Sequence, residues 1–183
     1  MKSIYKIISI IFGAVLLDQV TKGALVYILT GTVPVFGRAW DIIPFPYMMS
    51  QVTNFFNLVF TWNPGTSFSL FRALGEAAPL IIIVLTGIVI GILGYYLFKR
   101  AASHEKWPLA LIVGGALGNL IDRVRFGAVI DFLDFHVGGW HWPAFNAADI
   151  CIAVGVGLYL LHFVIRYFKQ RVQDKNTQCA KKK

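Results

Sequence analysis

The sequence is poor in charge. Only 14% of its 183 residues are Asp, Glu, Lys or Arg, whereas a soluble domain usually carries about 25%. By contrast, 57% of the residues are hydrophobic and the mean hydropathy is +0.65. A water-soluble fold of this size could not cover so many apolar side chains with polar surface. The aromatic content of 15% also excludes a disordered chain. The composition therefore indicates an integral membrane protein built as one compact unit.

Acidic residues and cysteines are scarce as well. The chain has 9 Asp and Glu against 17 Lys and Arg, which gives a net charge of +8. Most of the cations lie in three short segments that flank apolar runs: Lys2 to Lys6, Lys99 to Lys106, and Arg166 to Lys183. This distribution is typical of cytoplasmic loops and argues against nucleic-acid binding. The two cysteines, Cys151 and Cys179, are predicted on opposite sides of the membrane and therefore cannot pair.

Four apolar runs are long enough to cross a bilayer, which takes about 20 helical residues. They lie at about 7–29, 79–98, 107–124 and 148–168. The first run resembles a signal peptide, but no small-x-small cleavage site follows it, so we interpret it as an uncleaved helix. The sequence thus predicts an all-α membrane protein with a four-helix bundle in residues 1–171. A basic tail, 172–183, is expected to be disordered.

The distribution of Lys and Arg predicts the orientation of the bundle. The long connections 30–78 and 125–147 contain few cations, whereas both ends and the short connection 99–106 contain many. The termini are therefore expected in the cytoplasm and the two long connections outside. Residues 52–62 are rich in β-branched and aromatic residues, which predicts a small extracytoplasmic β element within 31–72. Trp140 and Trp142 in the second connection are expected at the level of the lipid headgroups.

Several polar side chains fall inside the predicted spans, where ionisable groups are costly and usually functional. At 1.5 Å per residue, Asp18 and Asn119 each lie about 18 Å above the inner boundary. Lys22 and Asp122 lie slightly higher, and Asp149 opens the last span at a similar level. This agreement in depth predicts one shared site in the outer third of the bilayer.

Each of these residues also has a structural interpretation. Asp18 and Lys22, four residues apart on one helix face, could simply neutralise each other. Asp122 and Arg123 could form an ion pair at a helix end, and Asp149 could cap the last helix. Asp131 and Asp149 differ from the others because neither has an obvious cation nearby in the sequence.

Two carboxylates in a partly dry site can share a single proton, which favours acid–base hydrolysis of the aspartic-protease kind. Other chemistries have weaker support. Ser67 and Ser69 have no plausible base at their depth, and His136 with His141 is a weak metal signal that is better explained by interfacial histidines. We expect no metal and no cofactor.

Five motifs, in this order, resemble the lipoprotein signal peptidases (signal peptidase II) of bacteria. They are Asp18-Gln-Val-Thr-Lys22, Asn63-Pro-Gly65-Thr-Ser-Phe68, Gly114-Gly-Ala-Leu-Gly-Asn119-Leu-Ile-Asp122-Arg123, Gly127-Ala-Val-Ile-Asp131-Phe132 and Phe145-Asn146-Ala-Ala-Asp149. The resemblance extends from residue 5 to about residue 168. One departure is Thr66-Ser67-Phe68, where the family usually has Ala-Ala-Phe.

The resemblance implies an aspartyl endopeptidase of the bacterial inner membrane. It would cut diacylglyceryl-modified prolipoproteins just before the lipidated cysteine, and cyclic peptide antibiotics such as globomycin would inhibit it. By motif match, Asp131 and Asp149 form the catalytic dyad. The positions that line the substrate cleft match Asn63, Gly65, Asn119, Arg123 and Asn146, and those that support the site match Asp18, Lys22 and Asp122.

Two alternatives remain at this point. Membrane carboxylates are also typical of a proton-coupled transporter or channel subunit. Against this, the polar groups lie at one depth, whereas a transport path needs them at several depths. A noncatalytic scaffold would leave Asp131 and Asp149 without a role.

Overall fold

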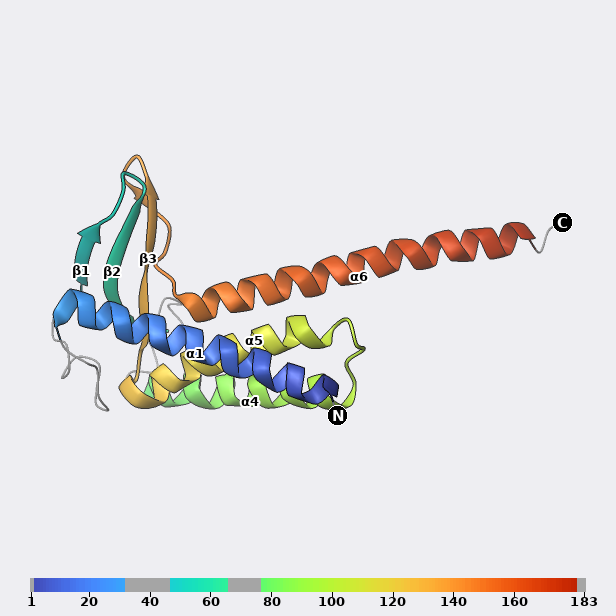
Figure 1. The fold of residues 1–183 in the computed structure, drawn as a ribbon, viewed down its shortest axis with the longest axis horizontal. Coiled ribbons are helices and arrows are strands. Elements are labelled where there is room, and N and C mark those ends of the chain that lie inside the picture. Colours follow the sequence, from blue (N-terminus) through green and yellow to red (C-terminus); the bar gives the residue numbers. More distant parts are fainter. Residues whose placement is uncertain (1, 32–46, 66–76, 181–183) are drawn as a thin grey trace.

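The computed structural model describes residues 2–31, 47–65 and 77–180, and four long helices dominate these segments (Figure 1). They are α1 (Lys2–Thr30), α4 (Ala78–Lys99), α5 (Lys106–Phe126) and α6 (Ala147–Ala180). Each helix contains one of the predicted apolar runs. Within the described residues, α1, α4 and α6 are long and apolar enough to cross a membrane. The structure thus has three candidate membrane spans, and α5 is the exception.

Helix α5 differs because it lies at the centre of the helices and packs against α1, α4 and α6. Its buried positions include small residues that let its neighbours approach closely. At Gly118, for example, a Cβ atom would stand 2.5 Å from Asp18 Oδ2. A helix that faces other helices on most sides does not need the uniformly apolar surface that lipid demands. This explains how α5 can carry Asn119, Asp122 and Arg123.

The small sheet is built from both long connections. Its antiparallel order is β1 (Tyr47–Gln51), β2 (Phe56–Asn63), β3 (Val129–Val137) and β4 (Trp140–His141). The prediction of a β element within 31–72 therefore covers only β1 and β2. The second pair was missed, although residues 129–137 are rich in β-branched and aromatic residues and are followed by Gly138-Gly139.

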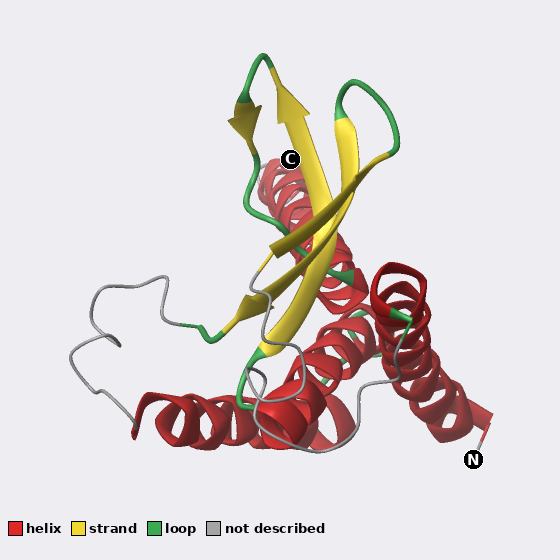
Figure 2. Ribbon diagram, turned by 90° about the vertical axis from the view of Figure 1, so that its left-hand side faces the viewer, coloured by secondary structure: helices red, strands yellow, loops and turns green. Residues whose placement is uncertain are grey.

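The sheet stands at the end of the helices where α1 and α5 end and α6 begins, and its strands cross the helix axes (Figures 1 and 2). An apolar cluster joins these elements, and its members are Val26, Phe60, Trp62, Phe126, Ala128 and Ile130. The rings of Phe60 and Trp62 meet edge to face at 5.0 Å. This cluster fixes β2 and β3 against the ends of α1 and α5.

The beginning of α1 and the end of α6 both lie at the opposite end of the molecule from the sheet (Figure 1). Helix α6 diverges from the other helices along its length and continues to Ala180. The described chain is therefore helical over most of residues 172–183, where the sequence suggested a disordered tail. Lys and Gln, which recur in this segment, have good helix propensity.

Candidate active site

Asp131 lies on β3, opposite Thr61 of β2, and its side chain is buried, with only 2% of the residue exposed. Both of its carboxylate oxygens accept hydrogen bonds. Asn63 Nδ2 donates to Oδ2 at 2.9 Å, and Asn146 Nδ2 donates to Oδ1 at 2.7 Å. Asn63 is itself held by the backbone N–H of Gly65, which donates to its Oδ1 at 2.9 Å. Gly65 has a φ of +76°, a conformation that glycine adopts without strain.

Asp149 lies in the first turn of α6 and takes part in a reciprocal cap with Asn146. Asn146 Oδ1 accepts from the backbone N–H of Asp149 at 3.0 Å, and Asp149 Oδ2 accepts from the backbone N–H of Asn146 at 3.1 Å. This is the geometry of a capping box, with Asn146 as the N-cap residue. The interpretation of Asp149 as the N-cap was therefore wrong by three positions. Because α6 starts here, Asp149 lies at the N-terminal end of the helix, with its carboxylate beside the backbone N–H groups of the first turn.

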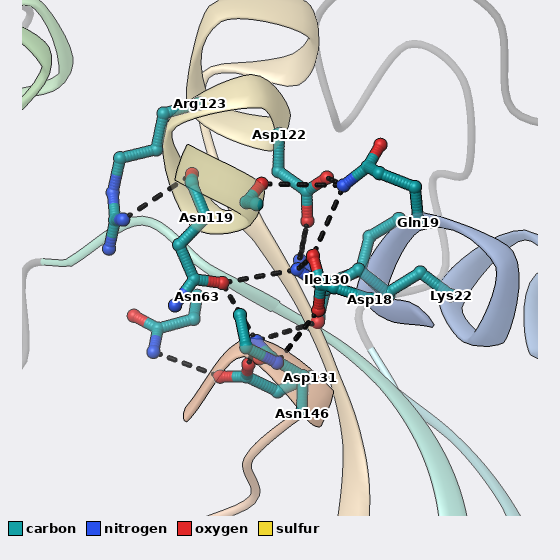
Figure 3. Close-up of polar contacts among 12 residues, drawn as sticks. Asp18, Gln19, Lys22, Asn63, Asn119, Asp122, Arg123, Ile130, Asp131 and Asn146 are labelled. Atoms are coloured by element: carbon teal, nitrogen blue, oxygen red, sulfur yellow. Dashed lines mark hydrogen bonds and ion pairs between the residues drawn. The ribbon is translucent and has the colours of Figure 1, made fainter. Parts of the chain in front are cut away.

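Asn146 connects the two aspartates. It is completely buried, and its Nδ2 also lies 3.1 Å from Asn119 Oδ1. Asn119, on α5, donates from its own Nδ2 to Asp149 Oδ1 at 2.9 Å. Asp131 and Asp149 thus come from different elements but share Asn146 as a partner, and Asn119 completes the arrangement. Figure 3 shows Asn63, Asn119, Asp131 and Asn146 in this arrangement.

A buried ion-pair network supports these residues from α1 (Figure 3). Lys22, only 2% exposed, donates to Asp18 and to Asp122 at 2.8 Å each, and to Asn119 Oδ1 at 3.1 Å. An ammonium group has three donors, and here each has an acceptor. The predicted Asp18–Lys22 pair is present. Within the described chain, however, Asp122 forms its ion pair with Lys22 and not with the neighbouring Arg123.

The two carboxylates of this network also join separate elements. Asp18 Oδ1 accepts from the backbone N–H of Ala148 at 3.0 Å, which ties α1 to the start of α6. Asp122 Oδ2 accepts from the backbone N–H of Ile130 at 3.2 Å, which ties α5 to β3. The network therefore positions the segments that carry Asp131 and Asp149.

Gln19 is a member of this network that the sequence analysis missed. Its Nε2 donates to Asp122 Oδ1 at 2.9 Å and lies 3.2 Å from Asp18 Oδ2. Its Oε1 accepts from Arg125 at 3.1 Å. The available signal was an amide side chain inside an apolar helix, directly beside Asp18.

Arg123 lies beside the two aspartates without forming an ion pair in the described chain. One Nη atom is 3.5 Å from the backbone oxygen of Asn119, and the buried Nε has no hydrogen-bond partner among the residues that the structure describes. A Cβ atom on Gly65 would stand 3.7 Å from the other Nη atom, so the guanidinium faces the Asn63–Gly65 turn. Buried donors of this kind are normally satisfied. Arg123 is therefore a candidate to bind a carbonyl or ester oxygen of a substrate.

A cleft of about 520 Å³ opens beside Asp131 and Asn63 and continues along the sheet to Asp134 and His141. His141 Nδ1 lies 2.9 Å from Asp134 Oδ1, and its ring stacks on that of His136 at 4.9 Å. The two histidines are thus engaged with each other and with Asp134.

Burial raises the pKa of Asp131 from 3.8 to about 7. This pKa is a balance: burial and the Asp149 charge raise it, whereas the hydrogen bonds from Asn63 and Asn146 lower it. At neutral pH, Asp131 therefore carries a proton for much of the time. A carboxylic acid and a nearby carboxylate that share one proton can activate water and protonate a carbonyl oxygen. The arrangement is suited to acid–base hydrolysis.

Comparisons with known proteins agree with this chemistry. The profile of the family described as signal peptidase (SPase) II matches residues 10–165. A lipoprotein signal peptidase of Anaplasma phagocytophilum (strain HZ) is 50% identical over 109 residues, which cover 60% of this chain and 69% of the relative. That of Janthinobacterium sp. (strain Marseille) is 44% identical over 148 residues, 80% of each chain.

A solved structure is similar as well. It is a bacterial membrane enzyme determined by the in meso method at 1.9 Å resolution, with 30% sequence identity and a TM-score of 0.65. The similarity covers 87% of this chain and 93% of that one. None of these relatives supports the alternative of a transporter or channel subunit.

Proposed function

The chain belongs to the signal peptidase II family of aspartic-type proteases, which remove signal peptides from prolipoproteins, and we propose that Asp131 and Asp149 are its catalytic dyad. One observation carries this assignment: Asn146 donates to Asp131 from its side chain and to Asp149 from its backbone. Asn146 thereby holds two carboxyl groups from different elements in place, beside an open cleft.

In the proposed reaction, ionised Asp149 takes a proton from a water molecule, whose oxygen attacks the scissile carbonyl carbon. Protonated Asp131 donates its proton to the carbonyl oxygen as the tetrahedral intermediate forms. The C–N bond then breaks, and the proton held by Asp149 passes to the leaving amine of the lipidated cysteine. Asp131 recovers its proton when the carbonyl is restored, so the dyad returns to its starting state.

The neighbours of the dyad have separate roles in this scheme. Arg123 binds a substrate carbonyl or lipid ester, because its buried Nε has no partner among the described residues. Gly65 leaves room for the substrate beside the dyad, since a Cβ atom on this residue would stand 2.9 Å from the Ile82 side chain. Asn63, Asn119 and Asn146 orient the carboxylates, and Asp18, Lys22 and Asp122 hold these residues in place.

The membrane placement is part of the same proposal. The protein is a multi-pass bacterial membrane protein, and we place it in the inner membrane with both termini in the cytoplasm. The cationic segments at the ends of the chain support this orientation. The sheet and the dyad then face the extracytoplasmic side, where diacylglyceryl-modified prolipoproteins and membrane lipids meet the cleft. Cyclic peptides of the globomycin type would inhibit by occupying the dyad.

The test is cleavage of a diacylglyceryl-modified prolipoprotein by the purified full-length enzyme. Asp131→Asn and Asp149→Asn keep the side-chain shape but remove the acid–base function, so each should lower kcat by roughly 10³-fold or more. The double variant should be little worse than either single variant, because the two residues act as a unit.

Asp174→Asn is the matched control, because Asp174 lies near the far end of α6, and it should cleave like the wild type. Wild-type turnover by folded Asp131→Asn would show that the dyad is assigned to the wrong residues. Asp122 would then be the next carboxylate to replace.

A further inference from the structure

A second group of ionisable and aromatic side chains lies at the other end of the helices, where the chain enters α5. A cavity of about 240 Å³ opens there between the α4–α5 connection and α6, and its lining includes His104, Glu105, Tyr159, His162, Arg166 and Tyr167. On α6, His162 is separated from Asp149 by roughly 20 Å at 1.5 Å per residue. The cavity is therefore distinct from the proposed dyad.

Arg166 is fixed at the wall of this cavity. Its Nη1 lies 2.8 Å from His104 Nε2. A guanidinium can only donate, so His104 accepts through Nε2 and has its own N–H at Nδ1. Within the described residues, Arg166 forms no ion pair with a carboxylate. The cavity thus has a positioned cation that is not paired with any carboxylate of the described residues.

His162 adds a buried polar atom to the same cavity. Its ring packs edge to face against His104 and against Trp107, with both centroid distances at 5.8 Å. These contacts fix the ring plane, but Nδ1 is buried and has no hydrogen-bond partner in the described chain. Leaving such an atom unsatisfied is unfavourable. A ligand that accepts hydrogen bonds from both His162 and Arg166 would satisfy the site.

The one carboxylate in the lining does not neutralise Arg166. Glu105 Oε2 accepts from the backbone N–H of Ala102 at 2.8 Å and lies 3.4 Å from Tyr96 Oη. Glu105 Oε1 is 3.9 Å from His104 Nε2. Glu105 therefore stabilises the turn that precedes α5. The flanking segments add further cations, namely Lys99, Arg100 and Lys106, so an anionic ligand is favoured.

The residues around the cavity indicate which kind of anion binds there. Tyr, Trp and Arg are found at the membrane–water interface. Tyr159 and Tyr167 line the cavity, and Trp107 packs against His162, at the end of the helices where both termini lie. On α6, the neighbouring Phe163 is 65% exposed, so an apolar surface suited to acyl chains adjoins the polar one. Basic pockets between helices at this level are known sites for phospholipid headgroups.

We propose that this cavity binds the phosphate of an anionic phospholipid. The lipid would lie in the leaflet on the side of the membrane where both chain termini lie. Arg166 donates to the phosphate oxygens, as guanidinium groups favour, and His162 Nδ1 donates a further hydrogen bond. The interfacial aromatic residues flank the glycerol backbone. This site is independent of the dyad, and its assignment does not rest on the proposed cleavage chemistry.

The test measures lipid binding to the full-length protein, purified in detergent and stripped of lipid. Phosphatidylglycerol is titrated and bound lipid is counted by native mass spectrometry, with phosphatidylcholine as the lipid of equal chain length and no net charge. Arg166→Gln should weaken phosphatidylglycerol binding by about tenfold, because it removes a charge-assisted hydrogen bond. Lys169→Gln is the matched control, since it removes one exposed charge from the same helix, and it should change the affinity less than twofold.

Two further measurements keep the result unambiguous. His162→Phe retains an aromatic ring but removes the nitrogen atoms, so it should also weaken phosphatidylglycerol binding severalfold. Inorganic phosphate and glycerol 3-phosphate, added without lipid, should neither bind nor compete at the same concentrations. Equal losses in Arg166→Gln and Lys169→Gln would overturn the site, because they would indicate attraction to charge alone. Equal binding of soluble phosphate would overturn the assignment to a lipid.

Discussion

The side-chain amide of Asn146 donates a 2.7 Å hydrogen bond to the carboxylate of Asp131. The residue that caps α6 therefore also positions the side chain that projects from β3. Asn146→Ala removes this bond and the cap together. We expect a loss of about 10²-fold in kcat/KM, because small displacements of catalytic groups have effects of this size. Stability should fall by about 1–2 kcal/mol, the usual cost of an N-cap.

Asn57→Ala is a suitable comparison for this variant. Asn57 is a buried amide on β2 that donates to Asp134 at 2.8 Å, outside the Asn146 arrangement. Thermal unfolding in detergent and kcat/KM should be measured for both variants. If the two lost stability and activity in the same proportion, Asn146 would be acting on the fold alone.

The pH dependence of cleavage follows from Asp131. Its pKa is raised to about 7, chiefly by burial, and the proposed mechanism requires its protonated form. The value of kcat/KM should therefore fall as the pH rises above about 7, approaching tenfold per pH unit. Initial rates with a lipidated substrate from pH 5 to pH 9 would show this limb. A profile that stays level to pH 9 would contradict the role of Asp131 as the acid.

The same pKa shift also makes stability fall as the pH rises, but over a lower pH range than activity. The folded-state pKa of Asp131 lies above its usual value of 3.8, so folding becomes less favourable as the pH rises from 3.8 through about 7. Asp131→Asn removes this titration. We expect the variant to melt at a higher temperature than the wild type at pH 8, with a much smaller difference at pH 5. An equal difference at both values would show that ionisation of Asp131 has no part in it.

Removing the ammonium group at the centre of the buried network should be strongly destabilising. Lys22→Met leaves Asp18 and Asp122 buried without their cation, and breaking buried pairs in this way costs about 3–5 kcal/mol. The triple variant Asp18→Asn, Lys22→Met, Asp122→Asn should recover much of the loss, because no unpaired charge remains. Lys6→Met, at an exposed position on the same helix, should have little effect. The thermal unfolding temperature should be measured for all three variants.

The sequence predicted the helices well, because a lipid-facing helix must be apolar along most of its length. The sequence also predicted that the polar residues of the helices form one site. Asp18, Lys22, Asn119 and Asp122 interrupt apolar runs at one depth. Their contacts could not be predicted from spacing alone. Asp122 pairs with Lys22 of another helix and not with Arg123 beside it, because helix packing decides which face meets which.

The sheet was harder to predict for a similar reason. β2 and β3 are separated in the sequence by α4 and α5, and their pairing depends on how those helices bring the two connections together. The sequence pattern of 129–137 contained a strand signal, but it did not indicate a partner. The sequence therefore indicated Asp131 as a candidate catalytic carboxylate without indicating its place on a strand.

The pairing of β2 with β3 also has a consequence for the synthesis of the protein, because it joins segments made at different times. Residues 56–63 leave the ribosome long before residues 129–137, and Asn146 and Asp149 follow later still. Contacts between such distant segments form late, because the intervening chain must be ordered first. A nascent chain that has already inserted α1 and α4 still lacks both carboxylates. With the dyad proposed above, proteolytic competence therefore begins only when the last helix is being made.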